Sequence, residues 1–197
     1  MGFILALLQL RDYQQKVVSD TYRVIKAGQN RPLINLPVGG GKTVVATKFV
    51  QDILSKGKRV LFLAHRRELV TQPRDTFGRY GIQSGIIKAG FEFQPHFPVQ
   101  IASVQTLVNR LPDIQVPDVI IIDEAHHSTA GTWAQILEFF PHATVIGLSG
   151  TPERTDGTGL DETFGTMVNG PQIPWLIEHG HLVEECPAGA RTPGQGR

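Results

Sequence analysis

Short runs of β-branched and other apolar residues recur along the chain and predict the strands of a buried sheet. Few polar residues interrupt them, which is typical of strands that are covered on both faces. The runs span residues 33–36, 59–64, 83–88, 99–102, 119–122 and 144–148. Between them, apolar residues recur at helical spacing, as at Trp133, Ile136, Leu137 and Phe140. The alternation predicts an α/β fold with a mostly parallel central sheet and helices on both faces.

Three stretches stand outside this alternation. The opening MGFILALLQL is apolar but short and lacks a basic leader, so it predicts a buried strand or packing arm rather than a signal peptide or membrane span. Pro73 falls within a helical pattern over residues 67–80, where an interior proline costs about 3 kcal/mol, so we expect the helix to kink or to begin afresh there. The tail, residues 187–197, is rich in Pro, Gly and Arg and is expected to be disordered.

Composition and charge narrow the class of protein. A chain of 197 residues has room for one domain, which we place at residues 1–186, since domains hold roughly 100–200 residues. The net charge of +1 carries no bulk field, so any site for a polyanion must be local. The lone Cys186 forms no internal disulfide or multi-cysteine zinc site. We therefore expect a cytoplasmic protein without a membrane partner.

A glycine-rich loop follows the run at residues 33–36 and precedes a helical pattern, which is the context of a phosphate-binding loop. Glycines let backbone N–H groups surround an anion, and a helix N-terminus adds partial positive charge. The lysine would neutralise the β- and γ-phosphates, and the threonine hydroxyl would bind Mg²⁺. The full pattern has a glycine where this chain has Leu36, so a plain glycine turn before an ordinary helix stays open. The residues of the loop are Pro37, Val38, Gly39, Gly40, Gly41, Lys42 and Thr43.

Two carboxylates follow the run at residues 119–122, within the sequence DEAHH. Buried charges at a strand end need a partner. Asp123 would bind a Mg²⁺ shared with nucleotide phosphates, and Glu124 would orient and deprotonate the attacking water. The alternative is a helix N-terminus that two acids stabilise. We expect His126 to hydrogen-bond across the cleft; zinc is disfavoured because no Cys or carboxylate cluster has ligand spacing.

Hydroxyl residues follow the run at residues 144–148, in the sequence SGTPER. Ser149 and Thr151 stand at a strand end, where their hydroxyls would bond the DEAH segment. A plain turn is the competing interpretation.

Residues that suit a nucleic-acid backbone follow two other strands. Arg66 and Arg67 come directly after one, and Gln105 and Thr106 begin a helix after another. Cations, amides and helix-end donors hold phosphates without reading sequence. A solvated helix start is the alternative for the two arginines.

In their order, these motifs resemble those of the first RecA-like motor domain of superfamily 2 helicases and translocases, especially the type III restriction and UvrB-like branch. The resemblance spans about residues 8–186. It implies that Gln14 reads the adenine edge, with Arg11 beside the base, and that Ser149 and Thr151 couple nucleotide state to strand contacts. The matching segments are LRDYQ (10–14), PVGGGKT (37–43), LAHRRELVTQ (63–72), SVQTL (103–107), DEAH (123–126) and SGTPER (149–154).

Three residues depart from the family pattern. Val38 and Gly40 stand where hydroxyl residues are more usual, and Gly150 stands where alanine is common. These departures bear on the rate of the reaction more than on the identity of the domain.

The same resemblance implies ATP and Mg²⁺ as cofactors and nucleic acid, DNA rather than RNA, as partner. In the family a second RecA-like domain supplies arginines to the γ-phosphate, each worth about 10³ to 10⁵ in rate, and nothing after Val183 resembles that domain. We therefore expect ATP binding and weak hydrolysis by the chain alone, with movement on nucleic acid when a second domain is paired with it. A catalytically weak ATP-binding or docking module is the alternative. The order of DEAH and SGTPER disfavours a small P-loop kinase.

Overall fold

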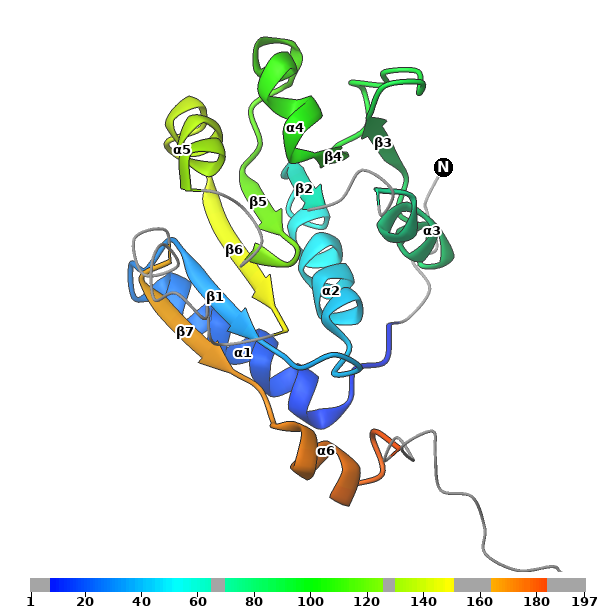
Figure 1. Ribbon diagram of the computed structural model, residues 1–197, viewed down its shortest axis with the longest axis vertical. Coiled ribbons are helices and arrows are strands. Elements are labelled where there is room, and N and C mark those ends of the chain that lie inside the picture. The colour runs from blue at the N-terminus through cyan, green and yellow to red at the C-terminus, as the bar shows by residue number, and fades with distance from the viewer. Residues whose placement is uncertain (1–7, 65–69, 126–129, 151–163, 184–197) are drawn as a thin grey trace, which may run out of the picture.

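A seven-stranded sheet runs through the protein in the order β3-β4-β2-β5-β6-β1-β7, and every strand pair is parallel (Figure 1). The computed structural model describes residues 8–64, 70–125, 130–150 and 164–183, and only the backbone of residues 130–134. This sheet confirms the predicted parallel α/β fold. The strands are β1 (Pro32–Asn35), β2 (Val60–Ala64), β3 (Ser84–Ile87), β4 (Val99–Ser103), β5 (Val119–Ile122), β6 (Thr144–Ser149) and β7 (Thr166–Asn169).

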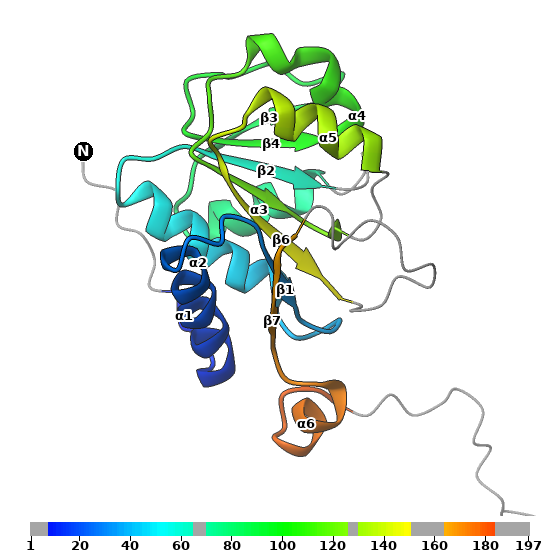
Figure 2. The ribbon, with the colours of Figure 1, turned by 90° about the vertical axis from the view of Figure 1, so that its left-hand side faces the viewer.

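Helices cover both faces of the sheet (Figure 2). One face packs against α1 (Asp12–Lys26), α2 (Lys42–Leu54) and α3 (Thr71–Arg79). The other packs against α4 (Val104–Leu107), the 3₁₀ helix η2 (Val108–Asp113) and α5 (Ala130–Phe139). A last helix, α6 (Ile173–Glu178), follows the edge strand β7. None of the helices within the described residues is long and apolar enough to cross a membrane.

The strands β2 and β5 are apolar along their whole length because each side of the sheet has its own core. In β2, Phe62 faces the core beneath α1, α2 and α3, whereas Leu61 and Leu63 face the core beneath α4 and α5. In β5, Ile121 and Ile120 divide in the same way. Burying one such side chain contributes about 1.5–3 kcal/mol, so an exposed polar face would be costly for either strand.

Two of the stretches that stand outside the alternation are resolved by the structure. α3 begins at Thr71, so Pro73 lies in its first turn, where the N–H that proline lacks would have no helical partner. The helix therefore begins afresh near the proline, as predicted. Leu10 packs against the core without forming a strand, as a packing arm would. Residues 1–7 and the predicted disordered tail lie outside the described residues.

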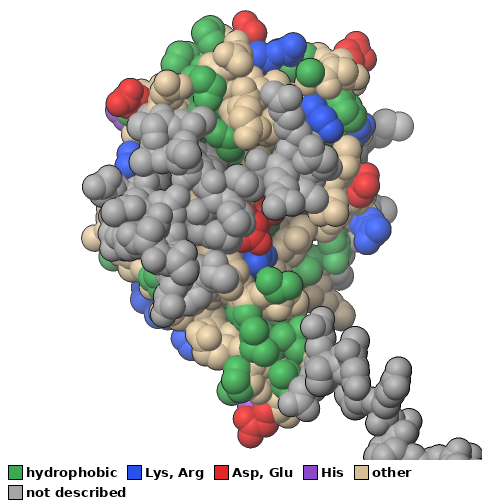
Figure 3. Space-filling model, viewed as in Figure 1, with side chains coloured by type: hydrophobic (Ala, Val, Ile, Leu, Met, Phe, Trp, Pro, Cys, Tyr) green, Lys and Arg blue, Asp and Glu red, His purple; other side chains and the backbone are tan. Residues whose placement is uncertain are grey.

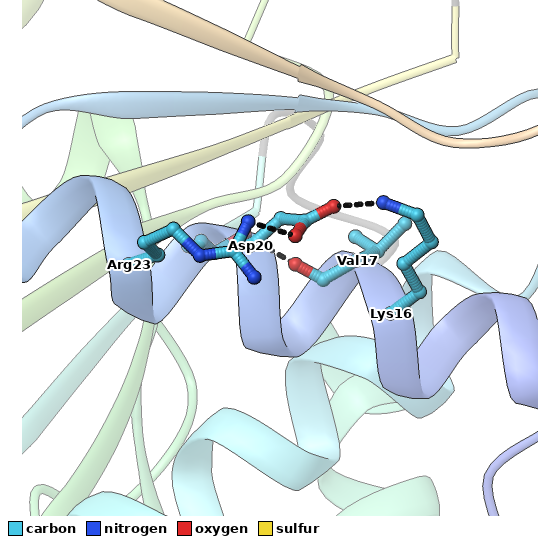
Figure 4. Close-up of polar contacts among 5 residues, drawn as sticks. Lys16, Val17, Asp20 and Arg23 are labelled. Atoms are coloured by element: carbon cyan, nitrogen blue, oxygen red, sulfur yellow. Dashed lines mark hydrogen bonds and ion pairs between the residues drawn. The ribbon is translucent and has the colours of Figure 1, made fainter.

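The exposed side of α1 carries one carboxylate between two cations (Figure 4). Asp20 accepts hydrogen bonds from Lys16 Nζ at 2.6 Å and from Arg23 Nη1 at 2.8 Å. The hydrogen bond from Lys16, together with the charges of Lys16 and Arg23, lowers the pKa of Asp20 against the opposing effect of burial. Exposed pairs at this helical spacing stabilise a helix by about 0.2–0.5 kcal/mol each.

Candidate functional site

The glycine loop between β1 and α2 has the backbone that an anion site needs. Gly40 N donates to Pro37 O at 2.9 Å and closes a turn. Gly39 (φ 78°) and Gly41 (φ 85°) adopt the left-handed conformation that favours glycine, and Gly41 caps α2. Backbone N–H groups of the first helical turn have no partner inside a helix, so those that follow Gly41 can donate to an anion.

The motifs that are distant in sequence meet at the carboxyl edge of the sheet. β1, β6 and β5 are neighbours, so the residues that follow them lie together. Leu36 N donates to Ser149 O at 2.9 Å, which joins the start of the glycine loop to the end of β6. Lys42 Nζ lies 3.0 Å from Glu124 Oε1, which joins the loop to the residues after β5.

The ammonium of Lys42 acts on both carboxylates at this edge, Glu124 by direct contact and Asp123 through its charge. Burial, followed by the adjacent charge of Glu124, raises the pKa of Asp123 above its ordinary value. The charge of Lys42 and the N–H of Glu124, which donates to Asp123 Oδ1 at 3.1 Å, oppose that rise without cancelling it. A cation bound beside Asp123 would favour its charged form.

The backbone of Glu124 is strained. Its φ of 51° lies in the left-handed region, and it is the only residue other than glycine with positive φ among the described ones. Such strain costs about 1–3 kcal/mol and is found mainly at functional sites. Here it turns the chain sharply after β5, and the Glu124 carboxylate reaches Lys42.

Thr43 and Asp123 line one cavity of about 290 Å³, with side chains of α3 as its other wall. A hydroxyl and a carboxylate are the oxygen ligands that Mg²⁺ prefers, and the ion is usually held by one or two carboxylates together with substrate phosphates and waters. The described part of the chain has no cluster of three or more His, Cys, Asp or Glu residues that would hold a metal without a nucleotide. The donor set therefore fits a Mg²⁺ that arrives with phosphates.

A larger cavity, of about 710 Å³, lies between α1 and α2 and includes no residue of the glycine loop. Its polar groups bond to one another: Asp52 accepts from Tyr22 Oη at 3.1 Å and from Lys48. The smaller cavity, not the larger one, holds Asp123, whose pKa is raised.

Gly150 lies beside Lys42, directly after β6. A Cβ built on Gly150 would come 2.6 Å from Lys42 Nζ, so the alanine that is common in the resembled family would displace the lysine tip. The departure from the family pattern therefore coincides with the contact between Lys42 and Glu124.

Of the two residues predicted to lie at the adenine base, Gln14 contacts the glycine loop from the start of α1. Gln14 is buried; its Oε1 accepts from Arg11 N at 3.0 Å, and its Nε2 donates to Gly40 O at 3.3 Å. Tyr13, which sequence reasoning missed, donates to the same carbonyl at 3.0 Å. Arg11 is exposed. Reading of the adenine edge by Gln14 stays a prediction.

The structure describes only some of the other residues that the sequence predicts for the site. Gln105 is exposed in α4, and the Thr106 hydroxyl accepts from Ser103 Oγ at 2.9 Å. Both stand at the carboxyl end of β4, two strands from β5 in the sheet order. The predictions for Arg66, Arg67, His126 and Thr151 fall outside the described residues.

Residues 7–154 match the family model described as "Type III restriction enzyme, res subunit". The chain belongs to this family. Two relatives are the "Putative ATP-dependent helicase IRC3" of Saccharomyces cerevisiae, 34% identical over 89% of this chain, and the "Type I restriction enzyme EcoAI endonuclease subunit" of Escherichia coli, 32% identical over 88%. The chain spans 28% and 23% of these relatives, so both are much longer proteins.

Solved structures show the same fold. The UvsW helicase of bacteriophage T4 aligns with a TM-score of 0.67 at 20% identity, covering 81% of this chain and 59% of that one. The fold of this family member is therefore the RecA-like helicase domain, and the predicted likeness to superfamily 2 helicases is confirmed.

Proposed function

We propose that this chain is the ATP-binding motor domain of a nucleic-acid helicase or translocase, which hydrolyses ATP with Mg²⁺ to drive movement when a second RecA-like domain is paired with it. The strongest support for this proposal is the contact of Lys42 Nζ with Glu124 Oε1 at 3.0 Å. Asp123 follows β5 directly before Glu124, and it lines a cavity together with Thr43. Residues 1–186 would form the motor domain.

Each residue of the site has a role in this proposal. The glycine loop donates backbone N–H groups to the phosphates, and Lys42 neutralises the β- and γ-phosphates. Asp123 and Thr43 would hold Mg²⁺, which neutralises charge that develops on the transferred phosphoryl group. Glu124 accepts a proton from the attacking water. Glu124 contacts Lys42; phosphate would compete for that ammonium and make the Glu124 carboxylate more available as a base.

We propose that the motor moves along nucleic acid, and along DNA rather than RNA. A relative from Sulfurisphaera tokodaii, 30% identical over 76% of this chain, is described as "DNA 3'-5' translocase XPB2". Gln105, exposed at the carboxyl edge of the sheet, would bond a backbone phosphate. Gln105→Ala should weaken duplex DNA binding severalfold and leave its salt dependence unchanged, because an amide releases no counterion. Fluorescence anisotropy across a salt series measures both, with Gln115→Ala, an exposed amide that precedes β5, as the control.

Nucleotide affinity in a Lys42→Ala variant tests the proposal. A charge-assisted hydrogen bond contributes about 1.5–3 kcal/mol, so the variant should bind ATP roughly 10- to 100-fold more weakly. Lys48→Ala is the matched control, because Lys48 lies on the same helix and pairs with Asp52 instead. Calorimetric titration with ATP and Mg²⁺ measures both variants. Unchanged affinity in Lys42→Ala would exclude the proposed phosphate loop.

A further inference from the structure

A short segment that follows the sheet packs back onto the glycine loop. We call residues 172–183 the α6 segment, since they comprise α6 with its cap and the turn after it. Leu176 is fully buried in the core beneath α1 and α2, and its carbonyl accepts from both His181 N (2.7 Å) and Leu182 N (3.1 Å). Gly180, at φ 68°, allows this reversal of the chain. Hydrophobic side chains gather on the surface at this end of the molecule (Figure 3).

Leu182 meets the phosphate end of the proposed nucleotide site. A Cβ built on Gly39 would overlap Leu182 Cδ2, so the leucine side chain lies directly against the backbone of the glycine loop. Leu182 also packs against the core cluster that α1 and α2 cover. The contact therefore connects the loop to the interior of the protein through a side chain that carries no charge.

The α6 segment also contacts Arg11, the residue predicted to lie beside the adenine base of the nucleotide. Arg11 Nη1 donates to His181 O at 3.3 Å and to the Tyr13 hydroxyl at 3.4 Å. The Tyr13 ring lies 5.2 Å from the His181 ring and 6.0 Å, edge to face, from Trp175. Tyr13 in turn donates to Gly40 O. One segment thus contacts Arg11, Tyr13 and, through Leu182, the loop itself.

We infer that the α6 segment positions the nucleotide loop, with Leu182 as a positioning residue that acts through Gly39. This inference rests on the proposed function, and it adds to it a residue that lies outside every motif of the phosphate site. Leu182 fixes where the loop N–H groups stand, whereas His181 O restrains the guanidinium of Arg11. Packing of this kind matters because a binding site loses affinity when its supporting contacts are removed.

Truncation of Leu182 is the test. Leu182→Ala should raise the Kd for ATP with Mg²⁺ roughly tenfold, the lower end of what the loss of an outer supporting contact costs. The same factor should apply to inorganic tripolyphosphate, because Leu182 contacts the phosphate end only. Leu182→Met, which keeps the side-chain volume, should restore most of the affinity. Ile173→Ala, at a position 49% exposed in the same helix, should bind as the unmodified protein does.

Thermal unfolding of each variant ensures that affinities are compared among folded proteins. Wild-type affinity in folded Leu182→Ala would overturn the positioning role. An equal loss in Ile173→Ala would overturn it as well, because the effect would then be a general loosening of α6.

A readout without nucleotide separates this inference from the proposed function. In protein labelled with ¹⁵N-glycine, Leu182→Ala should shift the amide resonances of Gly39, Gly40 and Gly41, and Ile173→Ala should not. Failure of the unmodified protein to bind ATP would refute the proposed function, while these resonances would still decide whether Leu182 positions the loop. Unmoved loop resonances in Leu182→Ala would refute the positioning role alone.

Discussion

Two clusters of charged residues in this protein shift the pKa of a carboxyl group in opposite directions. On α1, Asp20 lies between Lys16 and Arg23, so two cations satisfy one carboxylate at the surface. At the carboxyl edge of the sheet, Lys42 faces both Asp123 and Glu124, and its side chain is only 12% exposed. The pKa of Asp20 is lowered and that of Asp123 is raised.

The difference shows how the same residue types serve stability in one place and chemistry in another. The α1 cluster has more positive than negative charge around its acid and needs nothing further. At the sheet edge, burial and the adjacent charge of Glu124 make the ionised form of Asp123 costly.

Glu124→Gln should have the largest effect. The amide keeps the shape of the side chain but cannot accept the proton from water, so steady-state ATP turnover should fall about 10²- to 10⁴-fold, the contribution typical of a general base. ATP affinity should be retained or rise up to roughly fivefold, since Gln competes less than Glu for Lys42. Measured turnover within a factor of two of the unmodified protein would show that Glu124 is not the base.

Gly150→Ala should have a moderate effect on affinity. Its Cβ would displace the Lys42 tip and break the contact with Glu124 in the nucleotide-free protein. A pair of this exposure contributes up to about 1 kcal/mol, so ATP should bind up to roughly fivefold more tightly once that competition is removed. Gly78→Ala is the control, because a Cβ there meets no atom within 4 Å. Weaker ATP binding in Gly150→Ala would contradict the proposed competition.

Asp123→Asn should stabilise the nucleotide-free protein. Because the folded state raises the pKa of Asp123, the folded protein holds a proton that the unfolded chain has lost, and stability falls as pH rises through that interval. The variant should therefore unfold at higher temperature than the unmodified protein above the interval, by no more than about 2–4 °C, and no higher below it. Thermal unfolding between pH 4 and 8 measures this, and a lower Tm at pH 8 would contradict it.

Asp20→Asn should have the smallest effect. Its two exposed pairs contribute about 0.2–0.5 kcal/mol each, so the free energy of unfolding should fall by less than about 1 kcal/mol. Because folding lowers the pKa of Asp20, this contribution is present above the ordinary pKa of the residue and is lost as pH falls through the folded value. Denaturant titrations at pH 7 and in 1 M salt should show the difference shrinking with salt. A loss that persists in salt would mean that the pairs are not the cause.

The buried strands were predicted within a residue or two because both faces of each are covered. β5, for example, has the bounds that its apolar run predicts. β7 was missed: it is four residues long at the edge of the sheet, and only Val168 in it is buried. A strand with a single buried residue has no hydrophobic pattern to detect.

The core of the site could be predicted because a parallel sheet brings its carboxyl ends together. Only β6 lies between β1 and β5, so the residues that follow these two strands lie at the same edge, and Lys42 contacts Glu124 there. The contact of Leu182 with Gly39 could not be predicted, because it depends on where the chain travels after the edge strand. Tyr13 had a weak signal, since it stands beside Gln14 in the LRDYQ segment.

The central claim is that Asp123 holds a Mg²⁺ bound to the phosphates of ATP, and the Mg²⁺ dependence of ATP affinity tests it most directly. Calorimetric titrations of ATP with Mg²⁺ and with chelator would be compared among the unmodified protein, Asp123→Asn and the surface control Asp20→Asn. We predict that Mg²⁺ tightens ATP binding in the unmodified protein and in Asp20→Asn, and that this gain is lost in Asp123→Asn. A full Mg²⁺ gain in Asp123→Asn would contradict the account.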